Sequence, residues 1–507
     1  MKRVKKQYPE DFRTILGFST ISWVQGFATM VYSIFMQFLT DYSGIDGAIG
    51  QVGFAAAFGT VILTLTRIVD AVDDPLQAWI MDRSKECKFG KYRRFTLMSV
   101  FLIGIGTIVM FTLPDFIKSN GVALFIWVMG GYILFEMGCA FNGVSPMIQK
   151  ATTDARIRTK ITSCVRFAII IAVVPAAFMI PITTVVNTNI GDMGKAFPLT
   201  CIVITIISCC ISLVGVFLTK EPYHGNIKKE NTEAQEKLSI KDIWNMLKHN
   251  KPLWVHNISY FLGNMAYAAS TAVLVYFLKW FYCADMTTGA VDEIQYATVY
   301  GLYSALSLIP AFITPLIASF FVKKCGSVDK AMRIATLWTG IPYGIMFILY
   351  LFGILQISPM IFIILAFFAG IPANISTIPA LLLTNECADY VEYTTGKNMA
   401  AMTSAVNNLM QKTQSAIAVL IPGIVLMAVG YSVDAVTGAY AGDLTKLSGM
   451  VNGLTLIITL IPLVVSTISW AIYKFAYPIT PEYRQKMTEE LECRRAESQK
   501  NMGKMMK

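Results

Sequence analysis

Residues 67–75 have the sequence Arg-Ile-Val-Asp-Ala-Val-Asp-Asp-Pro. They lie within an apolar stretch, residues 52–80, that is long enough to form a membrane-spanning helix. Ionisable side chains in a span cost at least about 2.5–3.5 kcal/mol each on insertion scales, and they face a bundle interior or a water-filled cavity. One arginine and three aspartates here therefore predict a membrane protein whose interior handles a charged species.

The composition of the 507-residue chain supports the same conclusion. Hydrophobic residues make up 55% of it and charged residues only 15%, whereas about a quarter of the residues in soluble domains are charged. The first apolar stretch follows a charged tail, exceeds the apolar core of a signal peptide and has no small-residue cleavage site behind it. We expect a retained helix and an integral membrane protein.

Twelve apolar stretches are long enough to cross a hydrocarbon core of about 30 Å. They are residues 15–40, 52–80, 95–113, 121–149, 161–186, 197–219, 253–281, 295–322, 334–354, 360–384, 399–430 and 448–473. The predicted fold is an all-α membrane protein with twelve transmembrane helices.

A long polar interruption divides the chain into two halves. It spans residues 220–251 and follows the sixth apolar stretch. The predicted domains are a six-helix half at 1–219, this linker, a second six-helix half at 252–476 and a tail at 477–507. Two six-helix halves joined by a central loop are typical of alternating-access carriers, whose site lies near the midplane between the halves.

The basic residues predict the orientation of this bundle. Of 42 basic residues, four fall within spans, three (Lys118, Lys195 and Lys446) fall on one side of the membrane, and the other 35 fall on the opposite side. By the positive-inside rule this bias places both termini in the cytoplasm. The net charge of +10 is therefore an orientation signal and does not predict nucleic-acid binding.

Three segments near the membrane surfaces carry further signals. Ser239-Ile-Lys-Asp242 resembles a capping box before apolar residues at helical spacing, which predicts a short helix on the inner membrane surface. Thr480-Pro481 suits a cap and first turn, so the tail is predicted to be a charged, solvated helix. Lys279 precedes three aromatic residues and is predicted to be a snorkelling anchor beside an aromatic belt.

Several classes of function find no support in the sequence. It has no phosphate-binding G-x-x-x-x-G-K-[ST] loop, and we find no nucleophile with a base and an orienting partner. The ten cysteines lack zinc-site spacing and are expected to be packing residues or reduced thiols. Charges are concentrated in a few helices instead of repeated around a ring, which disfavours a selectivity-filter channel. We therefore predict neither an enzyme nor a cofactor.

The charged run at residues 67–75 has more acids than bases. At about 100° per residue, Arg67, Asp70 and Asp74 fall within an arc of roughly 60° on one side of a helix. Asp73 points about 60° from Asp70, so it either approaches the same cavity from its flank or pairs elsewhere. An ion pair with Arg67 accounts for one carboxylate or two but not for three. The excess negative charge predicts binding of a sodium ion or a proton.

Two motifs, one in each half, carry a family resemblance. The first is Arg67-x-x-Asp70-x-x-x-Asp74-Pro75, followed by Asp82-Arg83, Gly90-Lys91 and Arg93-Arg94. The second is Asp389-Tyr390-x-Glu392-x-x-Thr395-Gly396-Lys397. Together they resemble the signature of the glycoside-pentoside-hexuronide:cation symporters, the melibiose-carrier branch of the major facilitator superfamily, over almost the entire chain. The resemblance implies the major facilitator fold and cation-coupled sugar transport.

The resemblance also implies roles for single residues. Asp70 and Asp74 match the paired carboxylates that hold the coupling ion, as metal ligands if that ion is Na⁺ and as proton acceptors if it is H⁺. Asp73 is a candidate third cation-binding residue. Arg166 in the fifth span and Lys412 in the eleventh match basic residues near the sugar pocket.

Departures from the family pattern bear on the substrate. Gln25 stands where melibiose-type carriers have a sugar-binding aspartate, and the fourth span has Glu136 and Asn142 near the place of a D-x-P motif. A more positive chamber favours an anionic substrate such as a hexuronide, whose carboxylate would pair with Arg166. If Glu136 supplies the missing negative charge, a neutral glycoside or pentoside fits as well. The predicted substrate-binding residues are Arg166, Lys412, Gln25, Asn142 and Glu136.

Charged residues at the inner mouths of the spans predict a cytoplasmic gate. Asp82, Arg83 and Lys91 flank the second and third spans, and Asp389 and Glu392 follow the tenth. Opposite charges on the two halves would pair when the carrier is closed to the cytoplasm. Surface pairs are individually worth only about 0–1 kcal/mol, so this prediction depends on the family resemblance.

The sequence thus predicts a carrier that takes a sugar or sugar acid inward with Na⁺ or H⁺ across the cytoplasmic membrane. Its predicted partners are the substrate and the lipid bilayer, without nucleic acid, and the monomer is predicted to be functional. Two alternatives are a carrier of a non-sugar solute such as an amphiphile, and a sensor or scaffold that kept the fold. Loss of uptake in Asp70→Asn or Asp74→Asn would separate a carrier from a sensor.

Overall fold

The computed structural model describes residues 12–85, 87, 89–151, 155–219, 221, 248, 250–396 and 400–505. Regular structure in these ranges is helical, and two isolated β-bridges, Ala284–Val291 and Val433–Tyr440, occur in loops. The linker helix predicted after Ser239 lies outside the described residues.

The helices follow one another along the chain in two groups. Those before the linker are α1 (Phe12–Ile21), α2 (Trp23–Gln37), the π-helix η1 (Phe38–Tyr42), α3 (Ile45–Ile49), α4 (Phe54–Arg83), α5 (Lys91–Phe111), α6 (Asp115–Lys118), α7 (Gly121–Ala140), α8 (Val144–Ala151), α9 (Ala155–Ala177), α10 (Met179–Ile190) and α11 (Met193–Leu218). Those after it are α13 (Lys251–Tyr282), α14 (Glu293–Cys325), α15 (Val328–Leu351), α16 (Pro359–Ile375), α17 (Thr377–Thr395), α18 (Ala400–Val429), α19 (Leu444–Phe475) and α20 (Pro481–Met505).

The helices match the twelve predicted spans. Among the described residues, ten spans are long and apolar enough to cross a membrane, with α16 and α17 counted together. The bent pair of α1 with α2 and η1 makes an eleventh. The twelfth is α4, which is apolar over Phe54–Arg67 and then carries the charged run. The prediction of an all-α bundle of twelve transmembrane helices is confirmed.

The first span is broken at Ser22, between α1 and α2. The Ser22 hydroxyl donates to the carbonyl oxygen of Phe18 at 2.9 Å. The backbone N–H of Val24 donates to Oγ of Ser212 in α11 at 2.9 Å. Ser22 and Val24 are buried, so a side chain of another helix satisfies a backbone donor at a break that is enclosed by protein and shielded from lipid.

Prolines explain two further breaks. Phe178 separates α9 from α10, three residues after Pro175. Ser376 separates α16 from α17, four residues after Pro372. A proline inside a helix removes one hydrogen bond, and its ring clashes with the preceding turn, so the helix bends or ends nearby.

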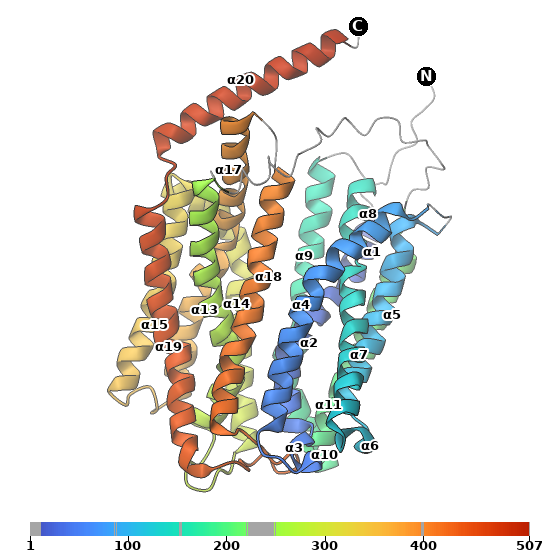
Figure 1. The fold of residues 1–507 in the computed structure, drawn as a ribbon, viewed down its shortest axis with the longest axis vertical. Helices are drawn as coiled ribbons and strands as arrows, with labels where there is room; N and C mark the ends of the chain where they lie inside the picture. The colour runs from blue at the N-terminus through green and yellow to red at the C-terminus, as the bar shows by residue number, and fades with distance from the viewer. Residues whose placement is uncertain are drawn as a thin grey trace. The chain divides into compact units, whose positions relative to one another are not determined.

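The helices group into two compact units, and the first comprises Met1–Lys228, Ala272–Leu308 and Val419–Thr455. In unit 1, α5 and α7 pack side by side (Figure 1). A Cβ at Gly106 would approach the backbone of α7 within 2.5 Å, and one at Gly138 would approach the backbone of α5 within 2.7 Å. Small residues at a helix crossing allow this close approach in a membrane.

Three segments gather at one end of unit 1: α3, the 283–292 loop and the 430–443 loop (Figure 1). The backbone N–H of Tyr440 donates to the carbonyl oxygen of Gly289 at 2.8 Å, which joins the two loops. Gly53, directly before α4, lies against Gly430. We call this region the loop end of unit 1.

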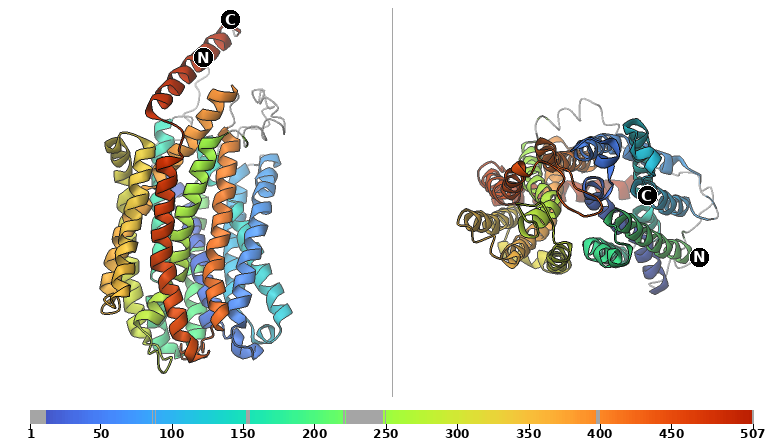
Figure 2. Two further views of the ribbon diagram at one scale, coloured as in Figure 1. Left: turned by 60° about the vertical axis from the view of Figure 1, so that its left-hand side comes forward. Right: turned by 90° about the horizontal axis from the view of Figure 1, so that it is seen from below.

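Unit 2 comprises Lys229–Thr271, Ile309–Ala418 and Leu456–Lys507. Its α15 packs against α16, and α17 packs against α20, which extends past the ends of the other helices of this unit (Figure 2). The prediction of a solvated tail is wrong for the first turns of α20, because Met487 and Leu491 are buried. Apolar burial, not charge alone, anchors this helix.

A charged network ties α20 to two other helices of unit 2. Arg484 donates to Oε1 of Glu386 in α17 through Nε at 2.6 Å and to Oδ1 of Asp329 in α15 through Nη2 at 3.0 Å. Tyr477 donates to the other Glu386 oxygen at 3.2 Å. Glu386 therefore holds the tail of the chain against the bundle.

Candidate functional site

The predicted cation site lies on α4. The backbone is one continuous helix over Phe54–Arg83, so it carries Arg67, Asp70 and Asp74 at the spacing that puts them on one side. The side chains of Asp70, Asp73 and Asp74 lie outside the described residues. The helical register is thus confirmed, whereas cation binding stays a prediction.

A polar cluster adjoins the charged run within unit 1. The guanidinium carbon of Arg67 lies 4.7 Å from the centroid of the Tyr32 ring, which suits a cation–π contact. The hydroxyl of Tyr32 donates to Oε1 of Glu136 in α7 at 2.6 Å. The rings of Tyr132 and Phe135 pack against Tyr32.

This cluster gives Glu136 a defined environment. Glu136 is only 8% exposed, so its carboxylate is shielded from solvent while it accepts the short hydrogen bond from Tyr32. The cluster therefore places a buried, hydrogen-bonded carboxyl group in the interior of the first half, next to Arg67 at the start of the charged run on α4.

Two predicted substrate residues lie near the crossing of α2 and α9. Arg166 in α9 is exposed, and Gln25 in α2 is half-buried. Gly26 packs against the carbonyl of Ile169, one turn after Arg166, so the crossing is close. The structure thus brings the helical turns that carry Gln25 and Arg166 together.

The other two predicted substrate residues have different surroundings. Oδ1 of Asn142 accepts from the backbone N–H of Val144 at 2.9 Å, directly at the start of α8. Asn142 thus has a capping role that sequence reasoning missed. Lys412 is half-buried on α18 in unit 2, on the same polar side of the helix as the exposed Asn408 and Gln411.

The predicted gate residues belong to both units. The side chain of Asp82 lies outside the described residues, and Arg83 is the exposed last residue of α4. Lys91 begins α5, and its Nζ lies 5.1 Å from the centroid of the Tyr92 ring. Asp389 and Glu392 lie on α17 of unit 2. Gating by pairs between these residues stays a prediction.

The Gly90-Lys91 motif also has a structural role. Oε2 of Glu221 accepts from the backbone N–H groups of Tyr92 and Arg93 at 2.8 and 3.0 Å. Gly90 has φ of +111°, and a Cβ there would meet the Glu221 side chain. A carboxylate at the N-terminus of α5 accepts from backbone N–H groups that have no partner within the helix. Its negative charge also interacts favourably with the positive end of the helix dipole. The motif therefore joins the start of α5 to the chain just after α11.

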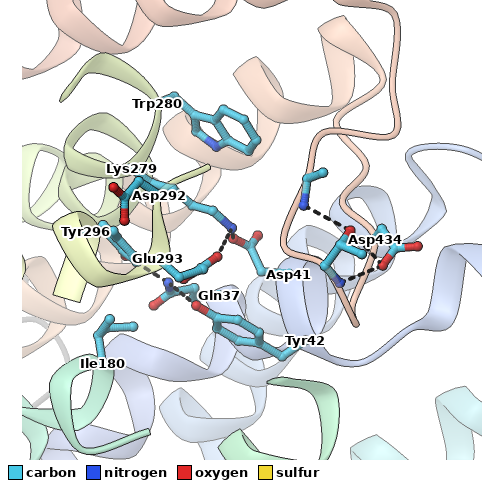
Figure 3. A network of polar contacts seen from close by, with 12 residues as sticks. Gln37, Asp41, Tyr42, Ile180, Lys279, Trp280, Asp292, Glu293, Tyr296 and Asp434 are labelled. Carbon is cyan, nitrogen blue, oxygen red and sulfur yellow. Dashed lines mark hydrogen bonds and ion pairs between the residues drawn. The ribbon is translucent and has the colours of Figure 1, made fainter. Parts of the chain in front are cut away.

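The prediction for Lys279 is wrong. Its side chain is 0% exposed, and Nζ lies 2.8 Å from Oδ2 of Asp41, which is also fully buried (Figure 3). Lys279 is thus one partner of a buried ion pair and not a snorkelling anchor. Sequence reasoning missed Asp41 and Glu293 as members of this cluster, since neither belongs to a family motif.

The fold and the polar interior together define a class of protein. Twelve spanning helices, a charged run on one of them and a buried carboxylate beside it are features of a membrane transporter. The family described as "MFS/sugar transport protein" has a sequence model that matches residues 17–481. The chain belongs to this family and, as its two motifs predict, to the glycoside-pentoside-hexuronide:cation symporters; it is a transporter and not an enzyme.

Three relatives illustrate the similarity. An "Uncharacterized symporter YnaJ" of Bacillus subtilis is 26% identical over 427 residues, which cover 83% of this chain and 81% of the relative. A "Glucuronide carrier protein homolog" of Escherichia coli is 22% identical and covers 96% of each chain. A "Lactose permease" of Lactobacillus helveticus is 20% identical and covers 93% of this chain and 70% of its own length.

Solved structures show the same fold. A bacterial homolog of the human lysosomal transporter Spinster superposes with a TM-score of 0.61 at 11% identity, over 94% of this chain and 98% of that one. The D-xylose-proton symporter superposes with a TM-score of 0.56 at 14% identity, over 91% and 96%. The predicted major facilitator fold is confirmed.

Proposed function

We propose that this protein carries a sugar, glycoside or hexuronide together with Na⁺ or H⁺ across the cytoplasmic membrane, by alternating access. The charged run of α4 supports this function: it lies on a continuous membrane helix, and its Arg67 contacts the hydrogen-bonded Tyr32–Glu136 pair. Charge in such a place is retained at a cost, so it serves ion or substrate handling.

In this proposal Asp70 and Asp74 bind the coupling ion. Their positions are one helical turn apart, which allows both carboxylates to approach one cation. A bound sodium ion or proton removes the excess negative charge and lowers the cost of moving the site through the membrane interior. Substrate and ion would then cross together, because the loaded site moves more easily than the bare one.

The substrate class in the proposal is a sugar acid. Glu136 already accepts a hydrogen bond from Tyr32 inside the first half, whereas the Arg166 side chain is exposed. An exposed guanidinium can bind a carboxylate through two parallel hydrogen bonds. The similarity to a relative named as a glucuronide carrier protein homolog supports the same substrate class.

The proposal is tested by uptake into membrane vesicles at fixed membrane potential, with imposed Na⁺ and pH gradients in turn. Labelled glucuronide should accumulate against its gradient with one of the two ions, and labelled neutral glycosides should accumulate less. Asp70→Asn and Asp74→Asn should each abolish gradient-driven accumulation. Asp115→Asn, a carboxylate exchange at a fully exposed side chain, is the matched control and should transport normally.

Other results of this experiment would overturn the substrate class, the cation site or transport itself. Preference for neutral glycosides would overturn the hexuronide assignment and leave symport standing. Accumulation that persists in both Asp variants would overturn the cation site on α4. Sugar binding without accumulation under either gradient would indicate a sensor that kept the fold.

A further inference from the structure

A buried ion pair joins the two sequence halves at the loop end of unit 1. Asp41 ends the first span, and Lys279 lies in the last turn of α13. Nζ of Lys279 donates to Oδ2 of Asp41 at 2.8 Å, and both side chains are 0% exposed. A fully buried pair is retained only when its geometry is good and its remaining hydrogen-bonding sites are satisfied.

The other oxygen of Asp41 is satisfied by hydroxyl groups. Oδ1 accepts from the hydroxyl of Tyr431 at 2.9 Å and from the hydroxyl of Thr40 at 2.8 Å. Tyr431 in turn accepts from Nε1 of Trp280 at 3.0 Å. Three donors thus satisfy both oxygens of the Asp41 carboxylate, as a buried ion pair requires.

Glu293 is a second carboxylate at the same lysine. It is the first residue of α14, and its Oε1 lies 4.0 Å from Nζ of Lys279 (Figure 3). Both of its carboxylate oxygens are buried without a hydrogen-bond partner among the described residues. Two acids against one base leave one excess negative charge, which is costly in a buried site unless Glu293 is protonated.

The surroundings of Glu293 leave no further compensating base among the described residues. The titratable and charged groups that face it are Asp41 and Tyr42 at the end of the first span, Lys279 and Cys283 at the end of α13, and Asp292 and Tyr296 on its own segment. Gly438 of the 430–443 loop, with φ of +72°, leaves space that the Glu293 carboxylate fills. Lysine is the single cation of this set.

The two loops that cover the cluster repeat one design. Asp285 and Asp434 each begin a D-x-x-T-G-A segment, and each glycine N–H donates to the aspartate carbonyl at 2.8 Å. Each segment closes with the same pair of backbone hydrogen bonds, and the Tyr440 N–H joins the two loops. Two rigid hairpins from the second half therefore meet over a contact with the first half.

We propose that Asp41, Lys279 and Glu293 form a proton-dependent latch at the outer end of the carrier, which closes with Glu293 in its neutral form. This inference rests on the proposed function, because alternating access requires contacts between the halves at one end to break. Closing converts the Glu293 carboxylate and one external proton into a carboxylic acid, and opening releases that proton. Acidic conditions outside therefore favour the closed latch.

The test measures the distance between spin labels across the latch. Gln51 in the first half and Val436 in the second are exposed and accept labels as Gln51→Cys and Val436→Cys, in a chain whose reactive native thiols have been replaced. In the purified carrier in lipid vesicles, the ratio of the population with the closed distance to that with the open distance should rise as the pH falls. For one linked proton this ratio should change by up to about tenfold per pH unit. Glu293→Gln should hold the latch closed at every pH. Wild-type pH dependence in Glu293→Gln would overturn the proposal.

Variants of the ion pair give an independent readout. Lys279→Met should lower the closed-to-open ratio at least about tenfold, because it leaves Asp41 buried without its cation. The exchange Asp41→Lys with Lys279→Asp should restore closed distances. Lys195→Met, at an exposed lysine, is the matched control and should change neither ratio nor pH dependence. A Lys279→Met carrier that still closes as the wild type does would contradict the latch.

Failure of the latch and failure of symport are distinguishable in these experiments. The distance measurement needs no substrate and no transport, so an inactive carrier still reports whether its outer end closes with proton uptake. A carrier that accumulates sugar but shows no pH-dependent distance would refute the latch alone.

Discussion

Two charged clusters of this protein have nearly the same geometry and different surroundings. At the loop end of unit 1, Lys279 and Asp41 lie 2.8 Å apart with side chains 0% exposed. In unit 2, Arg484 lies 2.6 Å from Glu386 and 3.0 Å from Asp329, with 22% of its side chain exposed and 10% of each acid. The first cluster joins the two sequence halves, and the second joins three helices of one half.

Distance alone therefore does not set the energy of an ion pair. Two charges interact several-fold more strongly in a low-dielectric interior than near water, yet each charge also loses more hydration there. Removing one partner from the interior leaves an uncompensated charge, whereas removing one near the surface leaves a charge that water can solvate. The buried cluster is therefore suited to a two-state contact and the half-buried one to a permanent anchor.

Lys279→Met should have the largest effect on stability. We expect it to lower the free energy of unfolding by about 3–5 kcal/mol, the cost of leaving a buried carboxylate without its cation. The measurement is thermal unfolding of the purified carrier, with Lys195→Met as the surface control. An effect as small as that of the control would show that the buried pair carries no special cost.

The double variant Asp41→Asn with Lys279→Met tests whether the two buried charges are energetically coupled. Because both charges are gone, we expect it to recover at least about half of the stability lost in Lys279→Met. The asparagine oxygen can still accept from Tyr431 and Thr40, which donate to Asp41 in the wild type. Additive losses in the double variant would contradict a coupled pair.

Tyr32→Phe should have the second-largest effect on stability, because it removes the hydroxyl group that donates to the buried Glu136 carboxyl. Glu136 would lose the 2.6 Å hydrogen bond, and we expect a loss of about 1–3 kcal/mol in the free energy of unfolding. Tyr267→Phe, which also removes a phenol hydroxyl, is the matched control. Equal losses in both variants would assign the effect to the loss of a phenol hydroxyl in general and not to the hydrogen bond with Glu136.

Arg484→Gln should have a smaller effect of about 1–2 kcal/mol, because water reaches the network that holds α20. The loss should appear as earlier proteolysis within α20, and thermal unfolding of the bundle should change little. Arg494→Gln, in an exposed pair with Glu490, is the control. Global destabilisation as large as that of Lys279→Met would contradict the expectation that the half-buried cluster contributes less to stability than the buried one.

Asp434→Asn should have the smallest effect, visible only in its pH dependence. The backbone N–H of Thr437 lowers the pKa of the Asp434 carboxyl below its usual range. A lowered folded-state pKa adds stability that is present above the unfolded pKa of about 3.9 and is lost as the pH falls through the folded value. The wild type should thus lose more thermal stability on acidification than Asp434→Asn does, and equal losses would contradict this role.

The sequence predicted the spans well because hydropathy is a local property. Each span needs only its own apolar residues, and even the charged α4 was recognised from its length and its neighbours. The break after Pro372 has a local signal in the proline, but its position at Ser376 depends on packing. The break at Ser22 depends on Ser212 of another helix, which no local pattern predicts.

The polar clusters were harder to predict because their members are far apart in the chain. Asp41 and Lys279 are separated by 238 positions, and each lies near the end of a span, where a charge usually reaches toward water. The family motifs drew attention to α4 and α17 instead, since resemblance identifies residues shared by relatives. Burial of Lys279 beside Asp41 follows from the packing of the loop end, which the sequence does not specify locally.

Gradient-driven uptake is the most direct test of cation-coupled sugar transport by this protein. Labelled glucuronide uptake into vesicles should rise above equilibrium when a Na⁺ or a proton gradient is imposed inward, and Asp70→Asn and Asp74→Asn should each abolish that rise while the carrier stays folded. The Asp115→Asn control should behave as the wild type does. Accumulation that is unchanged in both α4 variants, or no accumulation of any sugar under either gradient, would contradict cation-coupled symport through the α4 carboxylates.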